Sequence, residues 1–295
     1  MTGTVWAAAS GVGFGVFQSL NRRAVAHMDV EVATFVQLLV ATAILVVLAA
    51  GTGDLSVLRD APRSAIAYFV GGGLVHFFVG WTLLNASQKR IGAARTSPLI
   101  ATVPIFGVVV AFVTLHELPS ALAWFGIALI CAGAYTVALG RLSGLRRAAG
   151  RRDSLFGLGT ACAWAISPVL IRKGLALFDH PLLGLTIGLV ASVAAYALAL
   201  AVRRVTVRAE AFTRDALVFK LGAGVFVALS TWGRWVALDR TTVAVVLALG
   251  LMSIPIVLVL SPVVVGRHLE RVTGWIWLGA GLVIAGSLLL VVRTL

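Results

Sequence analysis

The chain contains one pattern twice: HELPSALAWFGIALICAG from His116 to Gly133, and HLERVTGWIWLGAGLVIAG from His268 to Gly286. Each copy has a glutamate, a glycine nine residues later, and a second glycine seven residues further on. Two glycines with this spacing are about two helical turns apart and therefore lie on one face of a helix. The pattern predicts two equivalent helices, each with a face of small residues suited to close helix packing.

The composition indicates that both helices belong to a membrane protein. Of the 295 residues, 60% are hydrophobic and only 12% are charged, which is more apolar surface than one water-soluble core can hide. Ten apolar stretches approach the roughly 20 residues that a helix needs to cross a bilayer. They cover residues 4–20, 31–50, 64–85, 97–115, 121–139, 154–171, 181–201, 216–238, 243–264 and 273–292. We predict an all-α integral membrane protein with ten transmembrane helices, the first of them retained because no basic leader precedes it.

The repetition extends beyond the quoted pattern. At an offset of 150 residues, the stretch 13–25 faces 163–175, and each stretch ends in a basic pair, Arg22-Arg23 and Arg172-Lys173. At an offset of 151, five matches follow: Gly71 with Gly222, Gly73 with Gly224, Trp81 with Trp232, Lys89 with Arg240, and Pro104 with Pro255. The order predicts two five-helix repeats, residues 1–140 and 154–295, joined by a basic loop at 141–153. Because five is odd, the second repeat enters the membrane from the opposite side, which makes an inverted repeat.

On these features the sequence resembles the EamA-type family of the drug/metabolite transporter superfamily. The resemblance rests on the duplicated plan, the basic pairs, the proline in each fourth helix, and Glu117 and Glu270 before the last helix of each half. It implies ten helices in two homologous halves, and a central cavity through which a small metabolite, amino acid or drug is carried or exported.

The formal charge of +13 is concentrated in the connections between apolar stretches. The odd-numbered connections hold sixteen Lys and Arg residues, and the even-numbered connections with the C-terminus hold six. This bias predicts cytoplasmic odd connections and two outside termini, with the lipid bilayer, not nucleic acid, as the partner of the charge. The expected location is the cell membrane, which is the inner membrane in a Gram-negative bacterium. Cys131 and Cys162 have no disulfide or zinc spacing, so no metal or other cofactor is expected.

Acidic residues are placed unfavourably for proton coupling. All eleven carboxylates fall at or beyond the predicted helix ends: Asp29, Glu31, Asp54, Asp60, Glu117, Asp153, Asp179, Glu210, Asp215, Asp239 and Glu270. A proton-coupled exporter often uses an acid inside the membrane. The first helix instead has Gln18 as its main polar residue, which disfavours acid-driven drug export. Glu117 and Glu270 are expected to cap the helices that follow them.

Two basic side chains inside apolar stretches are candidate substrate contacts. His76 lies midway along 64–85, where an imidazole could bind substrate or titrate near neutral pH, or could simply bond to a neighbouring helix. Arg234 could hold a carboxylate with both arms of its guanidinium; the alternatives are extension to lipid headgroups or a pair with Asp239. Lys220 is expected to extend to the headgroups.

Aromatic and amide side chains complete the candidate substrate site. Trp81 shares a helix face with Asn85, and Trp232 is its counterpart in the second half; interfacial anchoring is the alternative. Gln18 and Gln37 could contact a ligand or join helices. The predicted function is a secondary transporter of a small organic solute, amino-acid-like or nucleobase-like, working by alternating access. The alternative is an integral-membrane enzyme acting on lipid, for which the scattered histidines form no catalytic constellation.

Overall fold

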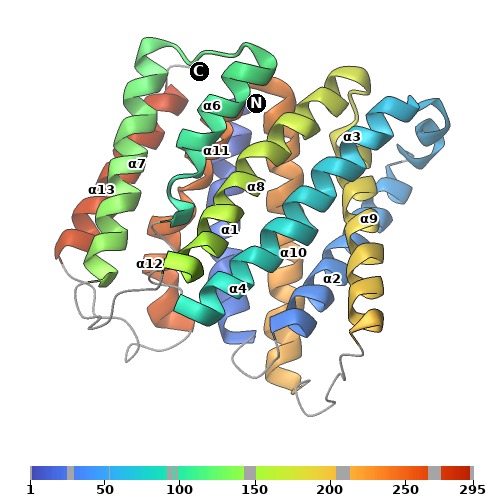
Figure 1. The fold of residues 1–295 in the computed structure, drawn as a ribbon, viewed down its shortest axis with the longest axis horizontal. Helices are drawn as coiled ribbons and strands as arrows, with labels where there is room; N and C mark the ends of the chain where they lie inside the picture. The colour runs from blue at the N-terminus through green and yellow to red at the C-terminus, as the bar shows by residue number, and fades with distance from the viewer. Residues whose placement is uncertain are drawn as a thin grey trace.

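Every element of the computed structural model is a helix over the described residues, which are 2–24, 30–52, 54–91, 96, 99–142, 151–203, 213–264 and 274–292 (Figure 1). In chain order the helices are α1 (Gly3–Ala24), α2 (Val30–Gly51), η2 (Asp54–Asp60), α3 (Arg63–Gly73), η3 (Leu74–Gly80), α4 (Trp81–Ile91), α6 (Val103–Leu115), α7 (Ala121–Leu142), α8 (Arg151–Leu177), α9 (Pro181–Val202), α10 (Arg214–Arg240), α11 (Val243–Gly250), α12 (Ser253–Val264) and α13 (Gly274–Val292).

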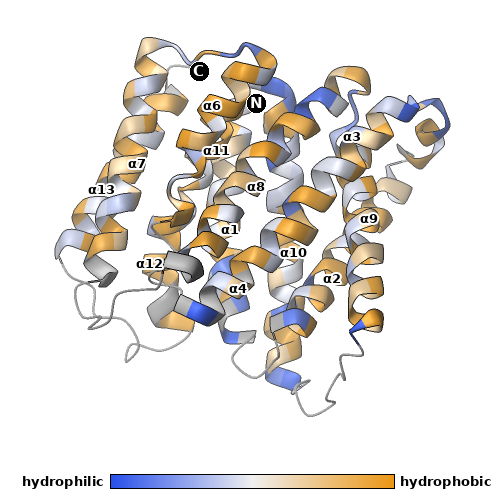
Figure 2. Ribbon diagram, viewed as in Figure 1, coloured by the Kyte–Doolittle hydropathy of each residue, from blue (hydrophilic) through white to orange (hydrophobic). Residues whose placement is uncertain are grey.

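The bundle has the surface of a multi-pass membrane protein. Within the described residues, eight helical runs are long and apolar enough to cross a bilayer. Large apolar side chains such as Val47, Leu198 and Trp275 are two-thirds or more exposed, so lipid would cover them. Figure 2 shows hydrophobic residues along most of the length of the helices. Each of the ten predicted stretches coincides with helix, but α1 is not among the eight and α6 has only 13 residues. Ten crossings therefore stay a prediction.

Both predicted fourth helices are broken at equivalent places. The stretch predicted as one helix over 243–264 is divided between α11 and α12 by a turn at 251–252, and a turn at 101–102 precedes α6. The cause in each case is a proline two or three residues later, Pro255 or Pro104. Proline has no N–H to donate and its ring displaces the carbonyl four residues earlier, so the helix cannot continue through it unchanged.

The third helix is continuous but contains one wide turn. Residues 74–80 form the π-helix η3 between α3 and α4, with His76 inside it. Such turns are rare and often mark functional sites.

The sequence predicts a glycine face for packing on each helix of the opening pattern, and the structure shows that the two faces pack against each other. A Cβ atom on Gly133 would lie 2.5 Å from the carbonyl oxygen of Gly279, and one on Gly286 would lie 2.7 Å from that of Gly126. The first glycine of each helix thus meets the second glycine of the other. This reciprocal crossing brings the backbones of α7 and α13 together with no side chain between them.

Helix directions follow from contacts at helix ends. Gly3 at the start of α1 lies against Arg240 at the end of α10. Gly157 near the start of α8 lies against Ser87 of α4, whereas Arg172 near its end bonds to the end of α10. Since α8 is about 40 Å long at 1.5 Å per residue, the ends of α4 and α10 lie at opposite ends of the bundle (Figure 1).

Candidate functional site

A cavity lies at the centre of the bundle, between helices of the first and second halves. Its volume is about 70 Å³, which is enough for several water-sized molecules. Its walls come from α1, η3, the start of α6, α8, α10, and the break between α11 and α12. The lining residues are Phe14, Gln18, His76, Ile100, Val103, Trp164, Arg234, Leu247, Gly250, Leu251 and Ser253.

His76 is held in the cavity wall by α8. Its Nδ1 atom is 2.8 Å from the Oγ atom of Ser167, and its ring is stacked on Trp164 with 5.6 Å between ring centroids. The edge of Phe77 meets the same imidazole at 4.8 Å. These contacts fix the orientation of the ring and use one of its two nitrogens. Nε2 has no hydrogen-bond partner among the described residues and is the nitrogen available to a ligand.

Trp164 is fixed in turn by the π-helix. Its Nε1 donates to the carbonyl oxygen of His76 at 3.2 Å. The indole fits because residue 80 is a glycine, where a Cβ atom would lie only 2.5 Å from that Nε1. Gly80 thus allows α8 to approach η3 closely enough for the tryptophan and histidine to form one wall.

Arg234 of α10 lines the same cavity. A Cβ atom on Gly250 would lie 2.4 Å from its Nη2 atom, so the guanidinium occupies the space that the missing side chain leaves at the end of α11. The sequence left two alternatives for Arg234, extension to the lipid headgroups and a pair with Asp239, and neither applies. The side chain lines the central cavity, and no ion pair joins it to Asp239 in the described part of the chain.

Three of the six predicted site residues, Gln18, His76 and Arg234, line this cavity together. The two predicted tryptophans do not. Trp81 is buried and stacks on Phe17 with 6.1 Å between centroids, while Trp232 packs on Trp6 at 5.9 Å. Each ring therefore contacts an aromatic side chain of α1. The side chain of Asn85 lies outside the described residues.

Two aromatic residues of the lining were missing from the prediction. Phe14 of α1 and Trp164 of α8 occupy equivalent positions in the repeat, 150 residues apart. Ile100 and Leu251 are likewise equivalent, 151 apart, and each stands four residues before the proline that breaks its helix. The predicted alignment of the two halves contained this signal, because two repeats related by an axis would place matched residues near it.

Lys220 corrects another expectation. It does not extend to the headgroups, because its side chain is only 1% exposed. Its Nζ atom donates to Oδ1 of Asn21 at 2.5 Å and to Oε1 of Gln37 at 3.2 Å. The neighbouring helices α1 and α2 supply these oxygens, so the ammonium group is satisfied inside the bundle. Gln37 accordingly joins helices.

Glu117 does not cap the helix that follows it. Ser120 does so, by accepting from the backbone N–H of Ala123 at 3.3 Å. Glu117 instead accepts from the N–H of Val243 at 3.2 Å, at the start of α11, and pairs with Arg172 at 2.6 Å. Glu117 directly follows His116, which ends α6 in the left-handed conformation with φ of 53°. Glu270 and most of the basic loop 141–153 lie outside the described residues.

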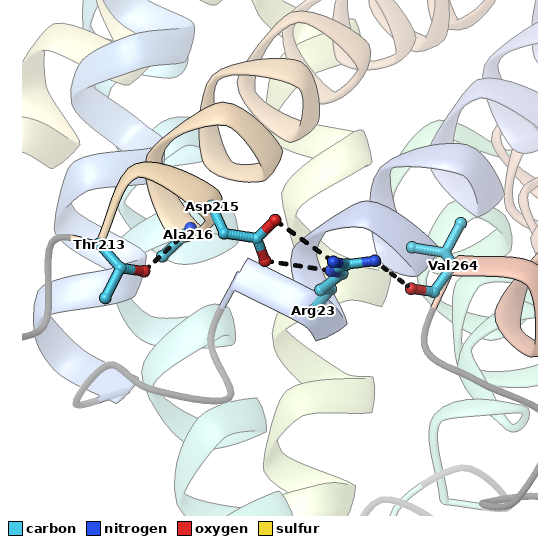
Figure 3. Close-up of polar contacts among 5 residues, drawn as sticks. All are labelled: Arg23, Thr213, Asp215, Ala216 and Val264. Carbon is cyan, nitrogen blue, oxygen red and sulfur yellow. Dashed lines mark hydrogen bonds and ion pairs between the residues drawn. The ribbon is translucent and has the colours of Figure 1, made fainter.

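Polar contacts join helices at both ends of the bundle. At one end, Arg23 of α1 binds both carboxylate oxygens of Asp215 at the start of α10 and the carbonyl oxygen of Val264 at the end of α12 (Figure 3). At the other end, Arg172 joins Glu117 to the carbonyl oxygen of Thr241, beyond α10.

Comparison with known proteins agrees with this architecture. A sequence profile described as the EamA-like transporter family matches residues 1–139. The fold is that of a multi-pass membrane protein, and the resemblance to the EamA-like transporter family is confirmed over these residues.

A solved structure shares the fold over nearly the whole chain. This structure, described only as a crystal structure of a protein, has a TM-score of 0.75 and covers 99% of this chain and 96% of that chain. At 17% identity, this similarity concerns the fold alone. No curated protein matches the sequence.

Proposed function

We propose that the protein is a secondary transporter of the cell membrane, which moves a small organic metabolite by opening the central cavity to each side in turn. Its architecture in this proposal is ten crossings arranged as two inverted repeats, residues 1–140 and 154–295. The single observation that carries the proposal is the cavity lined by equivalent residues of both halves.

Matched lining positions support a site shared between repeats. Phe14 faces the cavity together with Trp164, and Ile100 together with Leu251. In transporters built from inverted repeats, substrate binds at the repeat interface near the bilayer midplane, beside interrupted helices. The breaks before Pro104 and Pro255 are interruptions of this kind.

The opposed directions of equivalent helices support the inversion. The end of α4 and the end of its counterpart α10 lie at opposite ends of α8, and α7 crosses its counterpart α13 reciprocally at their glycines. A pseudo-twofold axis in the membrane plane would produce both relations.

Contacts at both ends of the bundle suit alternating access. A carrier of this type closes one end while the other opens. The Arg23–Asp215–Val264 contacts and the Arg172–Glu117 pair each join helices from different parts of the chain. We propose that each set stabilises closure at its own end.

The lipid enzyme is the weaker alternative. It would need a nucleophile with its base, or a metal cluster, in a cavity. In the described residues no three His, Cys, Asp or Glu side chains are grouped so that they could hold a metal ion. His76 bonds to Ser167, but Trp164, the side chain stacked on its ring, is neither an acid nor a base.

Purified protein in liposomes tests the proposal. We expect saturable uptake of a small metabolite that is accelerated by the same solute trapped inside. His76→Ala should reduce this uptake several-fold, whereas His180→Ala, a histidine outside the cavity, should not. Turnover of lipid in detergent, with no counterflow for any solute, would instead support the enzyme.

A further inference from the structure

Arg234 differs from other arginines of the bundle in its partners. Arg23, Arg172 and Arg203 each form an ion pair with a carboxylate at a helix end. Within the described residues, Arg234 has no carboxylate within ion-pair distance and donates no hydrogen bond. It nevertheless lies in the wall of the central cavity, inside a run of α10 apolar enough to cross the membrane.

A charge in this position is unfavourable without a partner. Removing a guanidinium from water into the interior of a membrane protein is unfavourable unless an opposite charge compensates it. A negative charge can reach the guanidinium through the cavity that the guanidinium lines. We therefore expect the molecule that occupies the cavity to bring this charge.

The cavity wall around Arg234 is shaped for the guanidinium. Gly250 leaves the space that Nη2 fills, since a Cβ atom there would be 2.4 Å away. Ser253, at the start of α12, and Gln18, which is exposed, add polar groups to the same lining. The remaining walls are apolar or aromatic, including Phe14, Leu247 and Leu251.

The lining favours a monoanion over a multiply charged ligand. Among the lining residues that the structure describes, Arg234 is the single Lys or Arg. One guanidinium matches one carboxylate, because its parallel N–H groups meet the two oxygens of that group. A phosphate dianion would retain uncompensated charge against the apolar walls.

We propose that the solute carries a carboxylate and that Arg234 binds it in the central cavity, with the apolar part of the solute against the aromatic wall. That the bound carboxylate belongs to a transported solute rests on the proposed transport function. The binding site itself can be tested separately from transport.

The test compares acids with neutral amides of the same shape. Thermal unfolding of the full-length protein in detergent is measured with hexanoate and hexanamide, 3-phenylpropanoate and 3-phenylpropanamide, and N-acetylleucine and its amide. A ligand that binds only the folded protein raises its unfolding temperature. We expect at least one acid to stabilise the protein and its amide to have no such effect.

Variants assign the effect to one side chain. Arg234→Gln should weaken acid binding about tenfold or more, because it removes charge-assisted hydrogen bonds. Arg234→Lys, which keeps the charge and loses the paired geometry, should retain part of the affinity and serves if the glutamine variant fails to fold. Arg203→Gln, which removes an exposed charge outside the cavity, is the matched control and should respond to acids as the natural protein does.

The outcomes separate the two proposals. Stabilisation by amides as well as by acids, no stabilisation by any acid, or an unchanged acid response in Arg234→Gln would overturn the carboxylate site. Saturable counterflow of a neutral solute would then leave transport standing. Arg234-dependent acid binding without counterflow would support the site and contradict the transport function.

Discussion

At the scale of residues, the position of His76 depends on a serine and a tryptophan that lie 91 and 88 positions later in the chain. The serine uses Nδ1, and the tryptophan fixes the plane of the imidazole, so Nε2 is the nitrogen left for a ligand. A histidine that was free to rotate would present this nitrogen only part of the time. The cavity wall is therefore a composite of η3 and α8.

Removing the serine hydroxyl should both destabilise the protein and impair the site. Ser167→Ala leaves the buried Nδ1 without its partner, which costs about 1–3 kcal/mol. We expect a lower unfolding temperature and slower uptake in liposomes. Ser192→Ala is the control, because this buried serine bonds only to Gly188 of its own helix and its loss should cost less. Equal effects of the two substitutions would contradict the role given to Ser167.

Gly250 offers a way to move Arg234 without changing it. In Gly250→Ala the new methyl group would meet the flexible end of Arg234, so the fold should tolerate it while the guanidinium is displaced. We expect an unfolding temperature close to that of the natural protein and several-fold weaker uptake. Gly281→Ala, where nothing lies within 4 Å of the added atom, should change neither quantity. If Gly250→Ala took up solute as fast as the natural protein, transport would not depend on the space that Gly250 leaves for the guanidinium of Arg234.

At the scale of elements, the contact between α7 and α13 depends on glycines, where no side chain holds the two backbones apart. A side chain on Gly133 would meet the carbonyl oxygen of Gly279 at 2.5 Å, and backbone cannot move aside as a side chain can. Gly133→Val should therefore separate the two helices and destabilise the protein by about 1–3 kcal/mol, as overpacking commonly does. Thermal unfolding in detergent measures this.

The control lies in the same pair of helices. Gly281→Val places the same side chain on an open face of α13 and should leave the unfolding temperature nearly unchanged. If both variants unfolded alike, the loss would reflect valine in a helix and not the contact between the helices.

At the scale of the whole molecule, the inverted arrangement predicts that matched positions lie on opposite sides of the membrane. Single cysteines at Lys89 and Arg240, in a variant lacking Cys131 and Cys162, should react with membrane-impermeant reagents from opposite sides. The distribution of basic residues predicts that the Lys89 side is the cytoplasmic one. Labelling of both positions from one side would contradict the inverted repeat.

What the sequence by itself determined is the class of the protein, an all-helical membrane protein, whereas its division into two inverted halves stays a prediction. Apolar stretches, glycine spacing and repeated prolines are local signals, since each acts within one helix and its immediate neighbour. They sufficed for the all-helical membrane fold and for the resemblance to the EamA-like family over residues 1–139, and they indicated a glycine face for close packing on both α7 and α13. They also singled out Gln18, His76 and Arg234 as polar groups inside apolar helices.

Only the tertiary structure decided which residues share the cavity and which partners the buried charges have. Trp164 and Ser167 reach His76 because α8 crosses η3 at Gly80, a relation between distant segments. Lys220 and Glu117 have partners on other helices for the same reason. A helix's own residues indicate how its side chains are distributed around its axis, but the direction and depth at which two helices cross determine which of those side chains meet.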